Sequence, residues 1–234
     1  MRSDQADKLH GGVGQFAAIN GIRYAIGDAS APMPAAFAAE PSLQRRQVHG
    51  TRIVEVTQPG QSCGEADGFY THTPGVMVNV LTADCLPVLF AHQNGHTVAA
   101  VHAGWRGLLA GVLEQAADTF IAAGEEEQWC CLIGPAIGAC CYEVDADLVS
   151  RFITTLPSIA PELISPAPRQ LDLQAIAKAR LEHRGINSID TIRECTLCTT
   201  QCGGSDRLYR YASYRRDGPG VPNQYACILI EPTG

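Results

Sequence analysis

The feature that most restricts the fold of this chain is a set of three apolar runs between residues 76 and 102. They extend from Val76 to Thr82, from Leu86 to Ala91 and from Thr97 to His102. Each run is short and bounded by turn-forming or polar residues, which is the pattern of a buried strand. The turn Ala83-Asp84-Cys85 separates the first two. Three such strands in close succession predict that β-sheet forms the core.

The rest of the pattern adds further strands and a few helices. Helical spacing follows the 97–102 strand and stops at Gly124. Asp145 and Asp172 are placed to cap two more helices, which end before Pro157 and near Gly185. Further strands are predicted at residues 52–56, 129–133, 188–193, 208–213 and 225–230.

The order of these elements bears on the fold class. Strands outnumber helices and the two do not alternate regularly, which predicts an α+β protein built as a mixed α/β sandwich. No repeat, low-complexity segment or linker divides the sequence, so residues 1–234 are predicted to form a single domain. A chain of 234 residues can bury such a core without disulfides.

Composition excludes several classes of partner. The net charge is −7 and no run of Lys or Arg occurs, so a nucleic acid is not expected to bind. The first twelve residues, MRSDQADKLHGG, lack the apolar core of a secretory signal, and no apolar stretch is long enough to cross a membrane. We therefore expect a soluble cytoplasmic protein, a monomer or small homo-oligomer, whose ten cysteines are reduced.

Three short segments place metal-binding side chains at the ends of predicted strands. They are Gln47-Val48-His49-Gly50, Thr82-Ala83-Asp84-Cys85-Leu86-Pro87 and Val101-His102-Ala103-Gly104-Trp105-Arg106-Gly107. Imidazole and thiolate suit zinc or copper, and a catalytic zinc site commonly has three protein ligands with one position open. His49, Cys85 and His102 are thus candidate ligands, although their spacing matches no local metal motif and each also fits a structural role at a strand end.

Longer motifs carry a family resemblance. QVHG, ADGFYTHTPGVMVNVLTADCLPVLF, AAVHAGWRGL, IGPAIGACCYEV, ECT and YASYRRDG occur in this order between Gln47 and Asp217. They resemble the YfiH family, also called the multicopper polyphenol oxidase or laccase-domain family. The resemblance implies a mixed α/β sandwich related to toxin-type cysteine hydrolases, and a metal held by His49, Cys85 and His102.

The resemblance also implies several activities. Family members are described as purine nucleoside phosphorylases that also deaminate adenosine and cleave methylthioadenosine, as polyphenol oxidases, or as peptidoglycan editing factors. This sequence departs from the family pattern at Gly14, where the family has Ser, and at Pro222-Asn223, where it often has Gly-Arg. These departures bear on substrate contacts and leave the three metal-binding residues unchanged.

Ligand chemistry favours a purine nucleoside enzyme over an oxidase. The chain has seven histidines and no His-x-His pair, so it cannot supply a trinuclear copper cluster together with a type 1 centre. A polyphenol oxidase activity would need copper in the single His/Cys site. Zinc lowers the pKa of a bound water to near neutrality, which suits deamination of adenosine, while phosphorolysis of adenosine, inosine or methylthioadenosine needs a bound phosphate.

Candidate substrate residues surround the same motifs. Gln47 and Arg106 are predicted to contact substrate or phosphate, with Arg106 at the start of a helix, and Arg45 and Arg46 are near enough in sequence to reach the site. Arg106 could instead only pack on its neighbour Trp105. Asp84 is a candidate base or hydrogen-bond partner of a metal ligand, and it equally suits a cap on the turn before Pro87.

Two other functional classes stay open. Cys85 and a histidine could form a nucleophile–base pair, which would suit a peptidoglycan editing hydrolase acting on muropeptide precursors. A non-catalytic zinc protein would need a fourth ligand, such as Cys63 or Cys140, and we predict none.

The remaining cysteines and histidines are expected to be structural. Cys195, Cys198 and Cys202 have metal-like spacing, but no second Cys pair follows them, so a second metal is not predicted. Core thiols are expected at Cys130, Cys131 and Cys227, and surface histidines at His72, His92 and His96.

Overall fold

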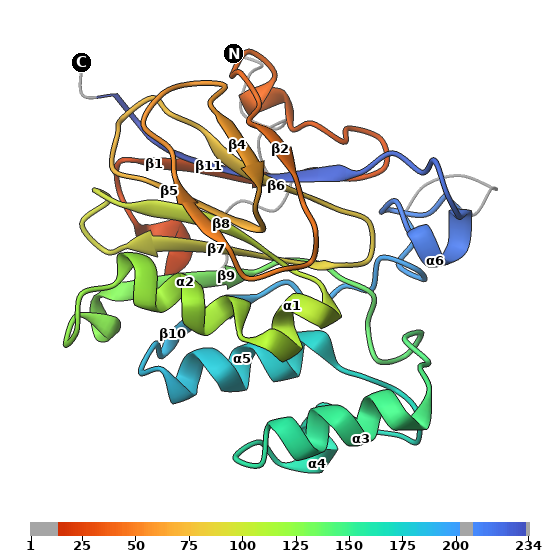
Figure 1. Cartoon of the computed structure of the whole chain (residues 1–234). Helices are drawn as coiled ribbons and strands as arrows, with labels where there is room; N and C mark the ends of the chain where they lie inside the picture. The colour runs from red at the N-terminus through yellow and green to blue at the C-terminus, as the bar shows by residue number, and fades with distance from the viewer. Residues whose placement is uncertain (1–13, 202–207, 233–234) are drawn as a thin grey trace.

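The computed structural model describes residues 14–201 and 208–232, and eleven strands lie within them. A six-stranded sheet has the order β10-β9-β7-β8-β5-β3, a three-stranded sheet the order β1-β11-β6, and β2 pairs with β4. The two larger sheets are layered, with helices beneath the six-stranded one (Figure 1). The strand bounds are β1 Ile22–Ile26, β2 Gln44–Arg46, β3 Ile53–Glu55, β4 Ser62–Glu65, β5 Gly68–Thr71, β6 Val78–Thr82, β7 Leu86–His92, β8 Val98–Ala103, β9 Trp129–Ile133, β10 Ser188–Thr191 and β11 Gln224–Ile230.

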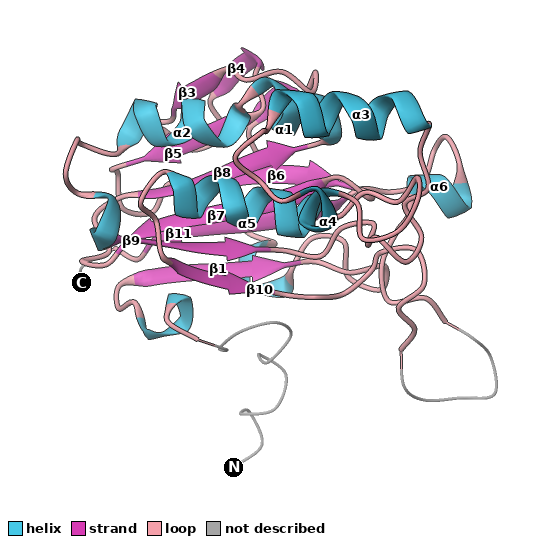
Figure 2. Cartoon of the chain, turned by 90° about the horizontal axis from the view of Figure 1, so that it is seen from below, coloured by secondary structure: helices cyan, strands magenta, loops and turns pink. Residues whose placement is uncertain are grey.

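Helices cover one face of the six-stranded sheet (Figure 2). The side chains of α1, α2 and α5 share a buried cluster with that face. The bounds are α1 Trp105–Ala110, α2 Val112–Phe120, α3 Ala146–Thr155, α4 Pro161–Ile164, α5 Leu173–His183 and α6 Tyr214–Asp217. The mixed α/β class predicted from the sequence is confirmed by this arrangement.

The apolar run in β7 is explained by burial on both sides of its sheet. Leu86, Val88 and Phe90 face the helices, whereas Leu89 and Ala91 face the three-stranded sheet. A strand covered on both faces has no polar side, so its sequence is continuously apolar. The same reason accounts for the buried thiols Cys130 and Cys131 in β9, and Cys227 is buried in β11, as predicted.

Several sequence predictions are wrong in detail. Residues 208–213 form no strand, only an isolated bridge between Thr200 and Tyr209, because their backbone groups bond scattered partners: the Arg210 carbonyl accepts from Ala29, and the Ala212 N–H donates to the Gln224 side chain. The helix after Gly104 is broken at Gly111, whose φ of 93° ends α1. A helix follows each predicted cap, but only the Asp172 side chain accepts a hydrogen bond, from the backbone N–H of Ala175 at 2.8 Å.

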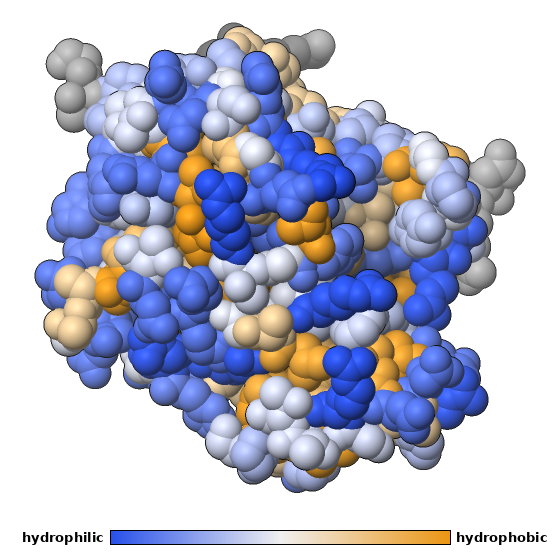
Figure 3. All heavy atoms as spheres, in the orientation of Figure 1, coloured by the Kyte–Doolittle hydropathy of each residue, from blue (hydrophilic) through white to orange (hydrophobic). Residues whose placement is uncertain are grey.

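The surface differs from expectation at one histidine. His72 and His96 are exposed as predicted, but His92 is buried, stacked on His96 and packed edge-on against Trp129. On the face in Figure 3, hydrophobic side chains show as separate areas among hydrophilic ones. Within the described residues, no helix is both long and apolar enough to cross a membrane.

The turn between β6 and β7 carries the chain from one sheet to the other. β6 ends at Thr82 in the three-stranded sheet, and β7 begins at Leu86 in the six-stranded sheet. In the antiparallel pair of β7 and β8, Leu86 lies opposite Ala103, so the start of β7 meets the end of β8. Cys85 and His102 are therefore neighbours at one end of the sandwich.

Candidate metal centre and its cavity

His49, Cys85 and His102 come together at that end of the sandwich. Their ligand atoms all lie within 4.8 Å of one another, and His49 Nε2 is 3.7 Å from Cys85 Sγ. A nitrogen and a sulfur that bind one tetrahedral zinc ion are about 3.6 Å apart, so the donor set fits such an ion. Among the described residues the group has these three members, and no fourth side chain joins it.

His102 is oriented by a carboxylate that sequence reasoning did not single out. Asp67 is fully buried, and its Oδ1 accepts a hydrogen bond from His102 Nδ1 at 2.8 Å. The backbone carbonyl of Asp67 also accepts from the His102 N–H at 2.7 Å. A carboxylate on Nδ1 leaves Nε2 to bind a metal, which is the usual support of a metal-binding histidine.

The same carboxylate shapes the loop that carries His49. The backbone N–H groups of Val48, His49 and Gly50 donate to Asp67 at 3.1, 2.9 and 2.8 Å. These bonds hold His49 at a φ of 61°, a left-handed conformation that is costly for a residue other than glycine. Asp67 therefore positions two of the three candidate ligands.

Close packing around the donors excludes larger residues. A Cβ at Gly104 would lie 2.6 Å from His49 Cδ2 and 3.0 Å from Cys85 Sγ. Any side chain at this position would displace a candidate ligand. The glycine of the HAGWRG motif is thus required by the centre itself.

Charge separation is built into the metal-free centre. Burial alone would raise the pKa of Cys85, but hydrogen bonds and charge from His102 and His49 lower it to about 6. Burial likewise opposes protonation of His102, and Asp67 and Cys85 raise its pKa to about 9. Between these values the metal-free pair is a thiolate beside an imidazolium, so the sulfur is available as a ligand or a nucleophile at neutral pH.

This charge separation predicts the reactivity of Cys85. In metal-depleted protein, iodoacetamide should alkylate Cys85 at a rate that falls as the pH drops through about 6, because only the thiolate reacts. Mass spectrometry of the peptide containing Cys85 would measure the rate. Added zinc should protect Cys85. A midpoint near the ordinary thiol value of about 8.5 would contradict the assignment.

A cavity of about 700 Å³ opens beside the donors. Its wall includes apolar and aromatic side chains, and four arginines lie around it: Arg45, Arg46, Arg106 and Arg215. Burial and the nearby Cys85 raise the pKa of the lining residue Tyr142 to about 12, so its hydroxyl stays protonated. The cavity combines a metal-binding corner, a flat apolar wall and positive charge.

Arg45 carries unsatisfied donors at this wall. Its Nη1 donates to the carbonyl of Leu43, but Nε and Nη2 are buried without a hydrogen-bond partner among the described residues. Burial lowers the pKa of this guanidinium, which nevertheless stays charged. Leaving such donors buried and unpaired is costly, so a rotation of the side chain that paired them with an anion in the cavity would be favourable.

The two predicted substrate residues, Gln47 and Arg106, both line the cavity, but the Gln47 side chain is held by hydrogen bonds and the Arg106 side chain is exposed. Arg106 is exposed and its guanidinium lies 4.3 Å from the centre of the Trp105 ring, so the packing alternative is also realised. Helix α1 is short, with six residues, and adds little dipole to the site. Both ends of the Gln47 amide bond the backbone of Leu81 at 2.8 Å, which ties the ligand loop to β6.

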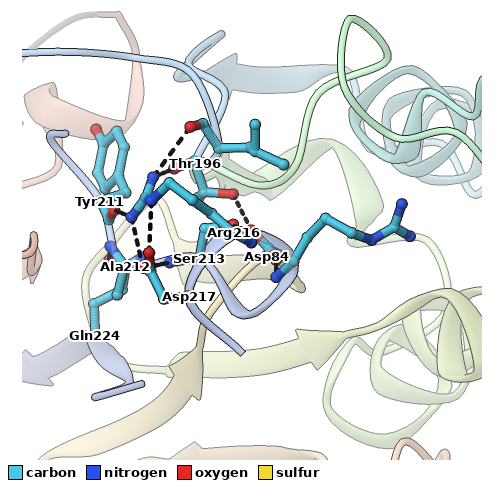
Figure 4. Close-up of polar contacts among 10 residues, drawn as sticks. Asp84, Thr196, Tyr211, Ala212, Ser213, Arg216, Asp217 and Gln224 are labelled. Atoms are coloured by element: carbon cyan, nitrogen blue, oxygen red, sulfur yellow. Dashed lines mark hydrogen bonds and ion pairs between the residues drawn. The ribbon is translucent and has the colours of Figure 1, made fainter. Parts of the chain in front are cut away.

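Asp84 lines the cavity, and the hydrogen bonds of its carboxylate go to residues other than the candidate ligands. Oδ1 accepts from Thr196 Oγ1 at 2.6 Å and Oδ2 from the backbone N–H of Arg215 at 2.7 Å. Figure 4 shows Asp84 meeting Thr196 beside Arg216, whose guanidinium binds Asp217 and the carbonyl groups of Thr196 and Tyr211. Asp84 thus crosslinks the turn before Cys85 to two distant segments, and Asp67 holds the orienting position instead.

The departures from the family pattern fall in different places. Gly14 lies against Asp190, where a Cβ would come within 1.9 Å of the carboxylate, and it does not line the cavity. Asn223 does line it. The second departure is therefore the one that meets the substrate space.

A second group of metal-binding side chains lies apart from the first. It consists of Cys140, Cys141, Cys195 and Cys198. The second Cys pair that seemed to be missing therefore comes from an earlier part of the chain, whereas Cys202 lies outside the described residues.

Comparisons with known proteins agree with the fold and the motifs. Residues 30–231 match the family described as multi-copper polyphenol oxidoreductase laccase. "Purine nucleoside phosphorylase YfiH" of Shigella flexneri is 38% identical over 172 residues, which cover 73% of this chain and 67% of the relative. The protein of the same name from Escherichia coli K12 is 37% identical over 172 residues, with the same coverage of 73% and 67%. The match thus spans about two thirds of the relatives' length.

Solved structures give the same result. YlmD from Geobacillus stearothermophilus superposes with a TM-score of 0.70 at 30% identity, covering 84% of this chain and 76% of that one. Protein NMB0706 of Neisseria meningitidis superposes with a TM-score of 0.69 at 31% identity, covering 82% and 76%. The relation to toxin-type cysteine hydrolases stays a prediction. By sequence match and by fold, this chain belongs to the YfiH, or laccase-domain, family.

Proposed function

We propose that this chain is a zinc-dependent purine nucleoside enzyme, which cleaves adenosine, inosine or methylthioadenosine with phosphate and deaminates adenosine. The observation that supports it best is the meeting of two features in one cavity. The three-donor group His49, Cys85 and His102 lies at one side, and the unsatisfied guanidinium of Arg45 lies on the wall. The names of the Shigella and Escherichia relatives support the phosphorylase part of this proposal.

Each part of the cavity has a task in this reaction. Arg45 and Arg106 hold phosphate, and Trp105 and Tyr142 offer flat surfaces for the purine. His49, Cys85 and His102 would hold the zinc ion, which supplies Lewis-acid chemistry at its open position. In phosphorolysis, a phosphate oxygen bonds to the ribose C1′ as the bond from C1′ to the base breaks. Asp67 keeps His102 in the tautomer that leaves Nε2 free.

The proposal is tested by metal content and nucleoside turnover on one anaerobically purified sample. Adenosine and inosine are supplied with and without phosphate, and the products are separated by chromatography. We expect the sample to contain zinc. Free base and ribose 1-phosphate should form only when phosphate is present, and inosine should form from adenosine with or without phosphate. Stoichiometric zinc at this site without any nucleoside turnover would overturn the proposal.

Arg45 gives a sharper prediction about phosphate. Arg45→Met keeps the apolar stem and removes two unsatisfied donors, so the Michaelis constant for phosphate should rise about 10-fold or more, since a charged hydrogen bond contributes about 1.5–3 kcal/mol. Arg46→Met is the matched control, because Arg46 is largely exposed and paired with Glu65. Steady-state kinetics with varied phosphate would measure both variants. Equal effects would contradict a specific role for Arg45.

A cysteine hydrolase is the second candidate, and one observation favours it. Asp67, His102 and Cys85 are hydrogen-bonded in series, as carboxylate, base and nucleophile are in cysteine hydrolases. Such an enzyme could edit muropeptide precursors. It would keep its activity after the metal is chelated and lose it on alkylation of Cys85, whereas the nucleoside enzyme would lose its activity in both treatments.

The oxidase and non-catalytic alternatives have less support. Within the described residues, the first donor group can hold a single copper and the second consists of four thiols, so neither is a trinuclear centre. The open position of the three-donor group also differs from a closed structural zinc site. Copper-dependent oxidation of a phenol by zinc-free protein remains the direct test of the oxidase alternative.

A further inference from the structure

We propose that this chain carries a second, structural zinc site formed by the thiol cluster of Cys140, Cys141, Cys195 and Cys198. The four Sγ atoms lie within 4.8 Å of one another, and those of Cys140 and Cys198 are 3.7 Å apart. Two thiolates on one tetrahedral zinc ion are separated by about 3.8 Å. The cluster therefore needs only small side-chain movements to enclose an ion.

The backbone around Cys195 is arranged as in a metal-binding turn. Its Sγ accepts a hydrogen bond from the Gly138 N–H at 3.2 Å and others from the N–H groups of Leu197 and Cys198. Such bonds stabilise a thiolate and orient it toward a metal. A Cβ at Gly138 would lie 3.2 Å from Cys195 Cβ and 3.4 Å from Cys140 Sγ, so this glycine allows the two segments to approach.

The donor set indicates the metal. Four thiolates and no open position are typical of structural zinc, whereas the three-donor group beside the cavity leaves a position free. Four sulfur atoms this close suit a single ion, because a multi-iron cluster needs its cysteines further apart. The described cysteines are all free thiols, so the ligands are not committed to disulfides.

The position of the cluster shows what the ion would do. It joins the segment after β9 to the segment after β10, which also meet at a backbone bridge between Ala136 and Cys195 and in the buried apolar cluster beneath the sheet. Ile137 and Tyr142 of the first segment line the cavity. Thr196 of the second binds Asp84, next to Cys85. Zinc here would fix one wall of the cavity and take no part in the reaction.

The test counts zinc by mass spectrometry of the purified protein. We expect about two equivalents in the wild type and about one in Cys85→Ala, because that variant keeps the thiol cluster. Cys140→Ser/Cys198→Ser should also retain about one, and the triple variant none. Cys140 and Cys198 are exposed, so replacing them opens no core cavity. Cys198→His alone should retain the second ion, because imidazole is also a zinc ligand.

A spectroscopic arm identifies the ligands without relying on stability. Cobalt loaded into Cys85→Ala should give the intense sulfur-to-metal charge transfer of a four-thiolate site, and Cys140→Ser/Cys198→Ser should remove it. The proposal is overturned if Cys85→Ala retains no metal, if iron replaces zinc, or if the anaerobic protein contains a disulfide between Cys140 and Cys198. These outcomes do not depend on nucleoside turnover, so the proposal stands or fails separately from the proposed function.

Discussion

Cys85→Ala is expected to empty the cavity metal site and to lower kcat/KM for nucleosides by more than two orders of magnitude. Loss of an outer partner of a metal ligand already costs about 10–100-fold, and Cys85 is itself the proposed anionic ligand. Without it, two imidazoles remain, and neither carries a negative charge to balance the ion. Zinc content and phosphate-dependent base release, measured on the same sample, give the result.

The fold should tolerate this change. Cys85 is half-buried at the start of β7, so alanine removes a sulfur at a cavity wall rather than in the core. Cys63→Ala is a matched control, because Cys63 is buried away from the donors, and we expect it to cost about 1 kcal/mol of stability while zinc and activity are retained. Full activity in Cys85→Ala would remove both the metal and the nucleophile interpretation.

Asp67→Asn is expected to have the second largest effect, on metal binding and on folding together. The carboxylate accepts hydrogen bonds from three backbone N–H groups and from His102. In asparagine, one oxygen is replaced by an NH₂ group, which would face these donors and could not accept from them. We expect a loss of about 10–100-fold in zinc affinity. Removing one partner from a buried charged network also lowers the free energy of unfolding by about 3–5 kcal/mol.

The stabilising effect of the Asp67 carboxylate is expected to depend on pH. Burial would raise the pKa of Asp67, but the His102 hydrogen bond and the backbone N–H groups lower it below its ordinary value. Its stabilisation is therefore present at neutral pH and lost as the pH falls below about 4. Denaturant unfolding at several pH values should show this loss in the wild type and a flatter profile in Asp67→Asn.

A second buried carboxylate serves as the control. Asp28 also accepts backbone N–H groups, from Ser30 at 2.8 Å and Ala31 at 2.9 Å, and it does not line the cavity. Asp28→Asn should destabilise the protein while zinc affinity stays unchanged. If both variants bound zinc equally well, Asp67 would have no role beyond folding.

Local sequence was sufficient for the central strands and for the three candidate ligands. β7 and β9 are apolar throughout because both faces of their sheet are buried, and this burial leaves a signal in every residue. Asp172 could be recognised as a helix cap because its side chain accepts a hydrogen bond from the backbone N–H of Ala175, only three residues along the chain. His49, Cys85 and His102 were found because imidazole and thiolate at strand ends are chemically distinctive, and the family resemblance joined them.

Functional groups whose partners are distant in sequence were missed. Asp67 is an ordinary acidic residue until β5 pairs with β8 and brings it beside His102, 35 residues away. Cys140 and Cys198 are separated by 58 residues, so scanning for local pairs could not join them. The orphaned donors of Arg45 likewise depend on what packs around them.

By itself, the sequence determined the apolar strands, the helix starts and the ligand chemistry, because these depend on near neighbours or on the nature of single side chains. Only the tertiary structure decided that β6 and β7 enter different sheets, that Asp67 rather than Asp84 orients His102, and that four thiols form one cluster. The physical reason is that burial and hydrogen bonding between distant segments exist only after the sheets have packed.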